Sequence, residues 1–364
     1  MTSPTRIRIV GGGIAGLALA ASLDPERFDV TLVEQRGELP DVRTILAMWP
    51  EAVDALARIG VAEQLRSISP SIDRFPIRSS TGRSWSELTT PVGVLVGRDD
   101  LLAALDAAVP ASVARITERV DRVVTEPGEL VVGADGVHST VRRSGWGGRA
   151  DAALTPFLAV RGVLPESTPA EAMGEYWGRA RLYGVGPHRS GTNWYASFRT
   201  DLGPRHVDVA VALELAREGL DDLAPGLAGV LAAATPETSL AQRIWTTPRL
   251  RSYVRGRLVL VGDAAHAMTP NLGRGGCEAL VDAVTLGRLL GELPVDEALV
   301  AYDRERVRPS QRLRAASAAL MRVALAERAQ PARDGLLGVV SRVAARRARR
   351  TRQDAAGQSA AVPS

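Results

Sequence analysis

The N-terminal stretch RIRIVGGGIAGLALAASL constrains the fold of this chain more than any other. Gly11, Gly13 and Gly16 form a G-x-G-x-x-G pattern between an apolar strand and a helical run of leucine and alanine. The first glycine permits a tight turn, the second lets backbone amides approach a pyrophosphate, and the third allows close helix–strand packing. The helix N-terminus adds unpaired N–H groups and partial positive charge. The pattern predicts a dinucleotide-binding β–α–β unit.

A second strand completes this unit. The alternating, β-branched run FDVTLVE at 28–34 ends in Glu34, about twenty residues beyond the glycines, where a carboxylate can accept hydrogen bonds from ribose hydroxyls. A simple glycine-rich hairpin would not explain this acid. Both FAD and NAD fit these residues.

The rest of the chain changes pattern twice. Residues 130–134 (LVVGA) are typical of a buried strand, and residues 98–109 of a helix that begins with two aspartates. Between about 155 and 215, apolar and polar residues alternate as in an antiparallel sheet with one covered face. Four strands are expected there, with the sequences FLAVRGVL, RARLYGVGP, NWYASFRT and HVDVAVAL. Strand–turn–helix patterning returns at 258, and long Ala/Leu/Arg helices follow.

The cysteine content and the distribution of charge indicate the cellular compartment and the kinds of partner to expect. Cys277 is the only cysteine, which excludes an internal disulfide and suits a reducing compartment, so we expect a cytoplasmic protein. All 45 basic residues are arginine. The excess of arginine over acidic residues lies between 331 and 364, so the rest of the chain is not basic and we expect no nucleic-acid partner. No apolar run is long enough for a transmembrane segment, and no His/Cys/Asp spacing indicates a metal. Monomer and homodimer both stay open.

Two further motifs follow the first. VVGADGVHSTVR (131–142) has a DG turn at Asp135, and LVLVGDAAHAMTPNLGRGG (258–276) has a GD turn at Asp263, followed by Pro270 and a glycine cluster. With three motifs in this order, residues 5–330 resemble the single-component flavoprotein aromatic hydroxylases, the p-hydroxybenzoate hydroxylase-like monooxygenases. The resemblance implies FAD as cofactor and NADPH or NADH as co-substrate.

The resemblance also assigns roles to positions. Asp263 would bond to the flavin ribityl chain or pyrophosphate, Pro270 would lie against the ring, and the turn at 272–276 would present amides to the N1–C2=O edge. A helix N-terminus suits that edge because reduced flavin is negatively charged there. Simple helix or turn capping is the alternative for Asp263 and for Asp135. The predicted cofactor-binding residues are Gly11, Gly13, Ile14, Ala15, Gly16, Glu34, Arg43, Arg98, Asp135, Asp263, Pro270, Gly273, Arg274, Gly275 and Gly276.

The implied fold class is α/β, a Rossmann-type FAD-binding domain with an inserted, mostly antiparallel β-sheet substrate domain and C-terminal helices. The expected boundaries are 1–72, 97–154 and 250–300 for the FAD-binding domain, 73–96 and 155–249 for the substrate-binding β domain, 301–345 for the C-terminal helices, and 346–364 for a disordered basic tail. The segment between Val109 and Asp135 is short for the strands that relatives usually place there.

The implied activity is monooxygenation. After NAD(P)H reduces FAD, a flavin C4a-hydroperoxide would hydroxylate an aromatic or polyketide-like small molecule, with O2 as the oxygen source. An epoxidase or another oxidative tailoring enzyme of secondary metabolism is the alternative, and a non-catalytic FAD-fold binding protein is a second one. Alternation does not show which strand faces point inward, and no residue can be named as the base. The candidate substrate contacts are Arg181, Tyr183, Trp194, Tyr195 and Phe198.

Overall fold

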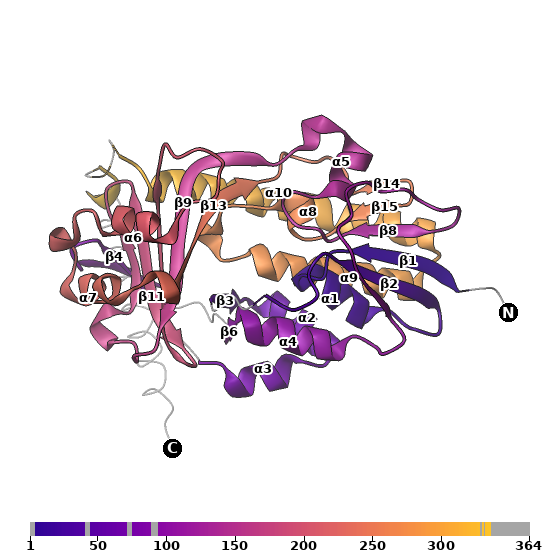
Figure 1. Ribbon diagram of the computed structural model, residues 1–364, viewed down its shortest axis with the longest axis horizontal. Coiled ribbons are helices and arrows are strands. Elements are labelled where there is room, and N and C mark those ends of the chain that lie inside the picture. Colours follow the sequence, from indigo (N-terminus) through magenta and orange to yellow (C-terminus); the bar gives the residue numbers. More distant parts are fainter. Residues whose placement is uncertain are drawn as a thin grey trace, which may run out of the picture.

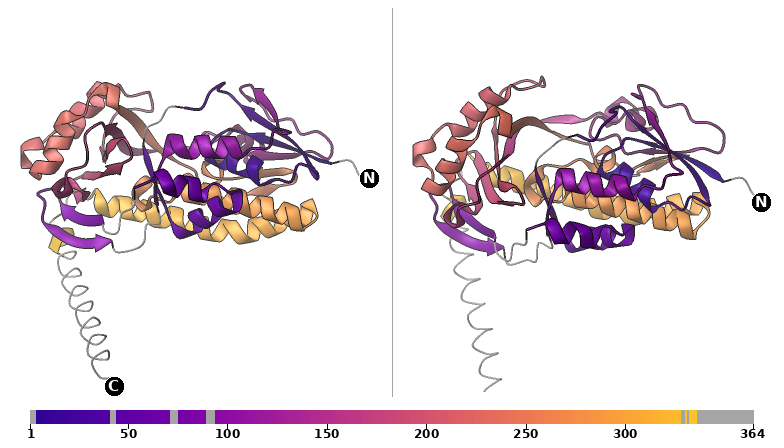
Figure 2. Two further views of the ribbon diagram at one scale, coloured as in Figure 1. Left: turned by 90° about the horizontal axis from the view of Figure 1, so that it is seen from below. Right: turned by 60° about the horizontal axis from the view of Figure 1, so that its bottom comes forward.

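The computed structural model describes residues 4–40, 44–70, 75–88, 94–327, 330 and 332–335. Two β-sheets lie at opposite ends of the molecule, and the helices α9 (Gly275–Glu292) and α10 (Val295–Ala324) run lengthwise along one side (Figures 1 and 2). None of the helices in these ranges combines the length and apolar character that a membrane crossing requires. Arg43 and the expected tail at 346–364 lie outside the described residues.

Within the described residues, the first sheet has six strands in the order β14-β15-β8-β1-β2-β7. Its pairs are parallel except that β14 runs antiparallel to β15. All four residues of β8 are buried, as expected for a parallel strand covered on both faces. The strands are β1 (Thr5–Val10), β2 (Phe28–Glu34), β7 (Ala114–Thr117), β8 (Leu130–Gly133), β14 (Val254–Arg255) and β15 (Leu258–Leu260).

Helices cover both faces of this sheet. Helix α1 packs against α4 and α9 on one face, and α5 packs against β8 and β15 on the other. The short pair β3 (Ile45–Met48) and β6 (Val94–Gly97) lies where the two halves of the molecule meet. The helices of this half are α1 (Ile14–Ser22), α2 (Pro50–Ile59), α3 (Ala62–Ile68), α4 (Arg98–Ala108), α5 (Thr140–Trp146) and α8 (Asp263–His266).

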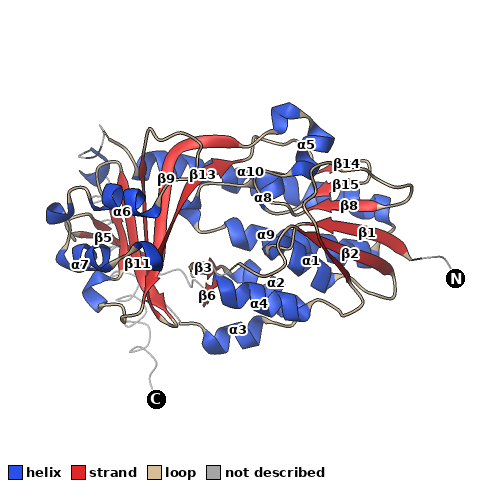
Figure 3. Cartoon of the chain, viewed as in Figure 1, coloured by secondary structure: helices blue, strands red, loops and turns tan. Residues whose placement is uncertain are grey.

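In the part of the chain that the structure describes, the second sheet has seven strands in the order β13-β9-β12-β11-β10-β4-β5, all antiparallel except for the β10–β4 pair. Helices α6 (Val209–Arg217) and α7 (Pro225–Ala233) cover its outer face (Figure 3). The strands are β4 (Phe75–Ser79), β5 (Ser84–Leu88), β9 (Ala153–Leu164), β10 (Gly174–Trp177), β11 (Arg181–His188), β12 (Gly191–Arg199) and β13 (Ser239–Thr246).

The second sheet therefore carries a different core on each face. Its outer core includes Tyr183, Trp194 and Phe198 together with α6 and α7. Its inner face packs Trp177 and Leu182 against the C-terminal end of α10. The interwoven arrangement agrees with the expected α/β fold with an inserted sheet, and we propose the domain boundaries given above on the basis of these two sheets.

One expected strand is a helix. Residues 206–213 (HVDVAVAL) alternate like a strand, but α6 begins at Val209 because the Asp208 carboxylate accepts hydrogen bonds from the amides of Ala210 and Val211, at 2.8 and 3.2 Å. This is an N-cap, and the residues that α6 buries then recur at helical spacing. The strand prediction for 206–213 was wrong. The short segment after Val109 holds a single edge strand, β7.

Candidate functional site

The first glycine turn is shaped by close backbone contacts. Gly11 has a φ of 109°, and a Cβ there would lie 2.4 Å from the Ala134 carbonyl oxygen. A Cβ on Gly16 would lie 1.8 Å from the Gly11 carbonyl oxygen, so helix α1 can pack this close only on glycine. At Gly13, the N-cap of α1, a Cβ would meet no atom within 4 Å. The amides at this helix N-terminus therefore face open space.

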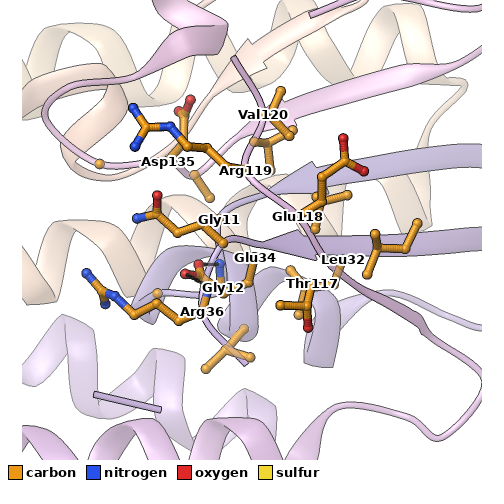
Figure 4. Close-up of a pocket in the computed structure, with 18 of the residues that line it drawn as sticks. Gly11, Gly12, Leu32, Glu34, Arg36, Thr117, Glu118, Arg119, Val120 and Asp135 are labelled. Atoms are coloured by element: carbon orange, nitrogen blue, oxygen red, sulfur yellow. Dashed lines mark hydrogen bonds between the residues drawn. The ribbon is translucent and has the colours of Figure 1, made fainter. Parts of the chain in front are cut away.

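Glu34 is held beside this turn. Its Oε2 accepts a hydrogen bond of 2.7 Å from the Gly12 amide, and its Oε1 accepts one of 3.1 Å from the Arg36 amide. Figure 4 shows Glu34 next to Gly12, with Arg119 and Asp135 on the other side of the pocket. The carboxylate is thus fixed at the end of β2 while it keeps further lone pairs for hydroxyl donors.

These groups line a cavity of about 620 Å³ at the carboxyl ends of β1, β2 and β8. This volume is in the range of small-molecule and cofactor sites, and the ends of parallel strands are where α/β sheets bind ligands. Five arginines on its walls supply positive charge for phosphate groups: Arg36, Arg98, Arg115, Arg119 and Arg143. The open amides, the fixed carboxylate and the arginines fit a dinucleotide such as FAD.

The two carboxylate oxygens of Asp135, in the same cavity, have different surroundings. Its Oδ2 accepts hydrogen bonds from the amides of Thr140 and Val141, at 2.7 and 3.1 Å, and so caps helix α5. Its Oδ1 is buried and has no partner among the described residues. Burial raises the pKa of Asp135. The capping alternative therefore accounts for one oxygen, and the other remains for a ligand.

The GD turn lies against the first glycine turn. Gly262 has a φ of 59°, and a Cβ there would lie 3.1 Å from the Cβ atoms of both Ala15 and Ala279. Asp263 is exposed, and its carboxylate accepts no hydrogen bond from another described residue. Burial lowers the pKa of Arg98, and the nearby Asp263 carboxylate opposes that shift. Two predicted cofactor residues from distant parts of the chain thus lie close together.

The second glycine cluster forms the N-terminus of α9. Gly273 has a φ of 60°, a Cβ at Gly275 would meet no atom within 4 Å, and Pro270 is exposed. A Cβ at Gly276 would lie 3.8 Å from Ile14 Cδ1, which brings the N-termini of α1 and α9 together. Both helices therefore begin next to each other with open, glycine-lined amides.

The Arg274 side chain points away from these amides. Its guanidinium lies 3.4 Å from Glu51 and 3.2 Å from Glu278, and it lies 5.2 Å from the centroid of the Trp49 ring. Its Nε is buried and has no partner among the described residues. Arg43 lies outside the described residues, so its predicted flavin contact has no structural description.

A buried charge cluster beneath the two turns was missed from the sequence. Asp282 accepts hydrogen bonds from the Gly262 amide at 2.8 Å, from His266 Nε2 at 2.6 Å and from Arg306 Nε at 2.6 Å. Arg306 also donates to Glu278 at 2.6 Å. The acids lie four residues apart in the sequence EALVD, which was the available signal, because such spacing puts both on one helix face.

Four of the five candidate substrate residues lie away from these turns. Tyr183, Trp194 and Phe198 are buried in the outer core with α6 and α7, and Arg181 bonds to the Leu215 carbonyl and to Glu218. These placements differ from the expectation, because α6 covers the strand face on which these residues lie. Tyr195 alone is on the inner face, where the alternation also places Glu175 and Arg161.

Two further residues next to the motifs, His138 and Cys277, make structural contacts. His138 stacks edge-on against Trp245, with ring centroids 4.8 Å apart. Cys277 is buried, and its thiol lies 3.1 Å from the Ala47 carbonyl oxygen. Within the described ranges, no group of three His, Cys, Asp or Glu side chains could hold a metal ion.

Comparisons with known proteins give the same picture. Residues 112–317 match the family model described as an FAD binding domain, and residues 9–45 match an NAD(P)-binding Rossmann-like domain. The chain is 30% identical to 2-heptyl-3-hydroxy-4(1H)-quinolone synthase of Pseudomonas aeruginosa, over 82% of this chain and 84% of that protein. It is also 30% identical to salicylate hydroxylase of Pseudomonas putida, over 82% and 81% of the two chains.

Solved structures share the fold. HpxO of Klebsiella pneumoniae, complexed with FAD and uric acid, superposes with a TM-score of 0.79 at 21% identity, over 93% of this chain and 97% of that one. A substrate complex of salicylate hydroxylase superposes with a TM-score of 0.75 at 21% identity, over 92% and 94%. With its motifs, its fold and its relatives in agreement, the chain belongs to the FAD-dependent aromatic hydroxylases and is an FAD-dependent monooxygenase.

Proposed function

We propose that this enzyme uses NADPH or NADH and O2 to hydroxylate a small aromatic or polyketide-like molecule. One observation carries the proposal. Two glycine-lined helix N-termini, at Ile14 and Gly275, lie side by side, since Gly276 is in contact range of Ile14. A single FAD can span both of them. When bound, the flavin supplies the redox chemistry, taking electrons from the nicotinamide and activating O2 for oxygen transfer to the ring.

The chain's own residues bind and orient this cofactor. The open amides at Gly13 would hold the pyrophosphate, since a helix N-terminus favours anions. The fixed Glu34 carboxylate would accept hydrogen bonds from ribose hydroxyls. Asp263 and Arg98, paired electrostatically, would contact the ribityl chain or the pyrophosphate.

The N-terminus of α9 would stabilise charge on the ring. A Cβ at Gly275 would meet no atom within 4 Å, and the amides at this helix start would face the edge of the flavin that becomes negative on reduction. Pro270 is exposed at the start of this turn and would lie against the ring. The substrate would then sit between this turn and the inner face of the second sheet.

The relatives support an aromatic substrate. Their names include salicylate hydroxylase of Pseudomonas putida, 6-hydroxynicotinate 3-monooxygenase of Bordetella bronchiseptica and aurachin C monooxygenase/isomerase of Stigmatella aurantiaca. These proteins act on aromatic rings that carry polar substituents, and we infer a substrate of this general kind for the present chain.

The test is turnover of the purified protein with NADPH or NADH and a panel of phenols, hydroxylated aromatic acids and quinolones. We expect yellow protein with bound FAD, faster NAD(P)H oxidation with a suitable aromatic compound, and a hydroxylated product in place of peroxide. A protein that retains no FAD would favour a non-catalytic binding role. An oxygenated product without a new ring hydroxyl would favour epoxidation or another oxidative reaction.

A further inference from the structure

Three polar positions form one row across the inner face of the second sheet. Arg161 on β9 is paired with Tyr195 on β12, Tyr195 is paired with Gly184 on β11, and Gly184 is paired with Glu175 on β10. Residues paired in adjacent strands point to the same side of a sheet. The row therefore presents a cation, a phenol and a carboxylate to the same space.

Gly184 allows the phenol and the carboxylate to meet. A Cβ at Gly184 would lie 2.0 Å from Cζ of the Tyr195 ring, so this ring lies across β11 where a larger residue would block it. The Tyr195 hydroxyl then donates a hydrogen bond of 2.7 Å to Glu175 Oε2. The contact between Tyr195 and Glu175 therefore requires a glycine at position 184.

Glu175 fixes the direction of that hydroxyl. Its other oxygen, Oε1, accepts a hydrogen bond of 2.6 Å from Trp177 Nε1. Because Glu175 accepts on both oxygens, the Tyr195 proton points toward Glu175. The lone pairs of the Tyr195 oxygen are then left as an acceptor for a hydrogen-bond donor from outside the pair. Burial raises the pKa of Tyr195, which keeps the phenol protonated.

Arg161 is an incompletely paired cation in the same row. Its guanidinium donates to Gln242 at 2.8 Å, its Nε is buried with no partner, and no carboxylate of the described residues forms an ion pair with it. Burial and, to a smaller extent, the neighbouring charge of Arg98 together lower the pKa of Arg161 to about 10. Arg161 is half-buried, and a cation that is partly removed from water with no carboxylate beside it points to an anion that arrives with a ligand.

The row faces the flavin-binding half of the molecule. Arg98 begins α4 in that half and lines the cofactor cavity. Asn193, two residues before Tyr195 and on the same strand face, accepts a hydrogen bond of 3.4 Å from the Ile45 amide of β3. The opposite face of the sheet is closed by α6 and α7. The row is therefore placed where the substrate of the proposed reaction would bind.

We propose that Arg161 and Tyr195 select an aromatic acid, a ring that carries a carboxylate and a neighbouring hydroxyl or amino group. This inference rests on the proposed function and names the substrate class of the same site. Arg161 binds the carboxylate, and Tyr195 accepts a hydrogen bond from the neighbouring donor. Glu175 is a positioning residue that acts through Tyr195.

Calorimetric binding to the FAD-loaded enzyme tests this with three probes: salicylate, benzoate and phenol. Wild type should bind salicylate most tightly. Arg161→Met should weaken salicylate and benzoate by at least about tenfold and leave phenol unchanged, since only the acids carry the anion. Tyr195→Phe should bring salicylate to the affinity of benzoate. Arg181→Met and Tyr183→Phe, matched changes on the outer face of the sheet, should alter none of the three affinities.

Glu175→Gln should change the ligand preference in a way that a simple loss of packing would not. Trp177 would hold the amide oxygen of the glutamine, and the amide nitrogen would donate to the Tyr195 oxygen, so the phenol proton would turn toward the ligand. The preference for salicylate over 2-methoxybenzoate should then fall by about tenfold or invert. An unchanged preference would overturn the role of Glu175.

Two results would overturn the proposal as a whole. One is wild-type affinity for phenol equal to that for salicylate, or no detectable binding of salicylate. The other is an Arg161→Met variant that binds all three probes as wild type does. The proposed function is scored separately, by FAD content and by product formation. Salicylate that binds as described but is not hydroxylated leaves the recognition site intact and contradicts only the proposed reaction.

Discussion

His266 Nε2 lies 2.6 Å from Asp282 Oδ2, and neither side chain is exposed to solvent. The same carboxylate also holds the Gly262 amide of the GD turn and the Arg306 guanidinium of α10. The Asp282 carboxylate therefore ties α8 to α9 and α10 beneath the turns that we assign to the flavin. A site of this kind works only if its backbone amides are fixed before the ligand arrives.

Asp282→Asn should destabilise the fold strongly. The substitution removes the charge that compensates His266 and Arg306 in a buried site, and breaking such a cluster costs about 3–5 kcal/mol. Urea denaturation followed by circular dichroism measures the free energy of unfolding. Asp296→Asn is the matched control, because its pair with Arg257 is largely solvated and should contribute little. Equal losses in the two variants would contradict the structural role of the buried cluster.

The same contact makes stability depend on pH in a defined way. Burial alone would lower the pKa of His266, but Asp282 raises it overall, and the pKa of Asp282 is lowered. The stabilising contribution of His266 is complete below the unfolded pKa and is lost as pH rises through the higher folded value. That of Asp282 is complete above its unfolded pKa and is lost as pH falls. Both are therefore complete between about pH 4 and 6.5.

The measurement is the difference in unfolding free energy between wild type and His266→Gln across this pH range. The difference should be largest inside the window and should shrink as the pH rises above it. A difference that grows toward alkaline pH would mean that the imidazole is neutral in the folded protein.

Cys277 should be chemically inert in the folded enzyme. Burial raises the pKa of its thiol to about 11, and the thiol contacts the Ala47 carbonyl. Thiolate is the reactive form, so labelling with an aromatic disulfide reagent at pH 8 should be slow and should follow unfolding. Rapid labelling of the native protein without loss of bound FAD would show that the α9 N-terminus opens far more readily than its packing indicates.

Positions that are set by neighbours in the chain could be predicted from the sequence. Positions that depend on contacts between distant segments could not. The turn at Gly11, the Asp135 turn and the Asp263 turn each place their residues through neighbours in the chain, so their positions could be inferred. The inward face of the second sheet could not be inferred, because it depends on which face of that sheet is covered by α6, the helix after β12. The sequence of that helix alternates like a strand, and the cap at Asp208 makes it a helix.

The row of Arg161, Tyr195 and Glu175 shows the same limit. The three residues come from separate strands, and only the register of β9, β12, β11 and β10 brings them into line. Alternation can group Tyr195 with Asn193 within one strand, but it cannot pair Tyr195 with Arg161 across two. The role of Gly184 is visible only once the Tyr195 ring is seen to lie over it.

Two alanine substitutions in the first motif should separate folding from cofactor binding. At Gly16 the new methyl group would lie 1.8 Å from the Gly11 carbonyl oxygen, a backbone atom that cannot move without shifting β1 or α1. Gly16→Ala should therefore lower the unfolding free energy by at least about 2 kcal/mol. At Gly13 the methyl group would meet no protein atom within 4 Å, and it would enter the cavity instead.

Gly13→Ala should consequently fold as wild type does and weaken FAD binding by at least about tenfold, because the methyl group occupies the approach to the helix amides. Flavin fluorescence titration gives the affinity and thermal unfolding gives the stability. Gly291→Ala is the control, a glycine in α9 whose Cβ would also meet nothing within 4 Å but which does not line the cavity. It should leave the FAD affinity unchanged and raise the stability by at most about 1 kcal/mol, because alanine favours a helix more than glycine does. If Gly13→Ala bound FAD as tightly as Gly291→Ala, the pyrophosphate would not lie against the first helix, and the cofactor would have to be placed elsewhere.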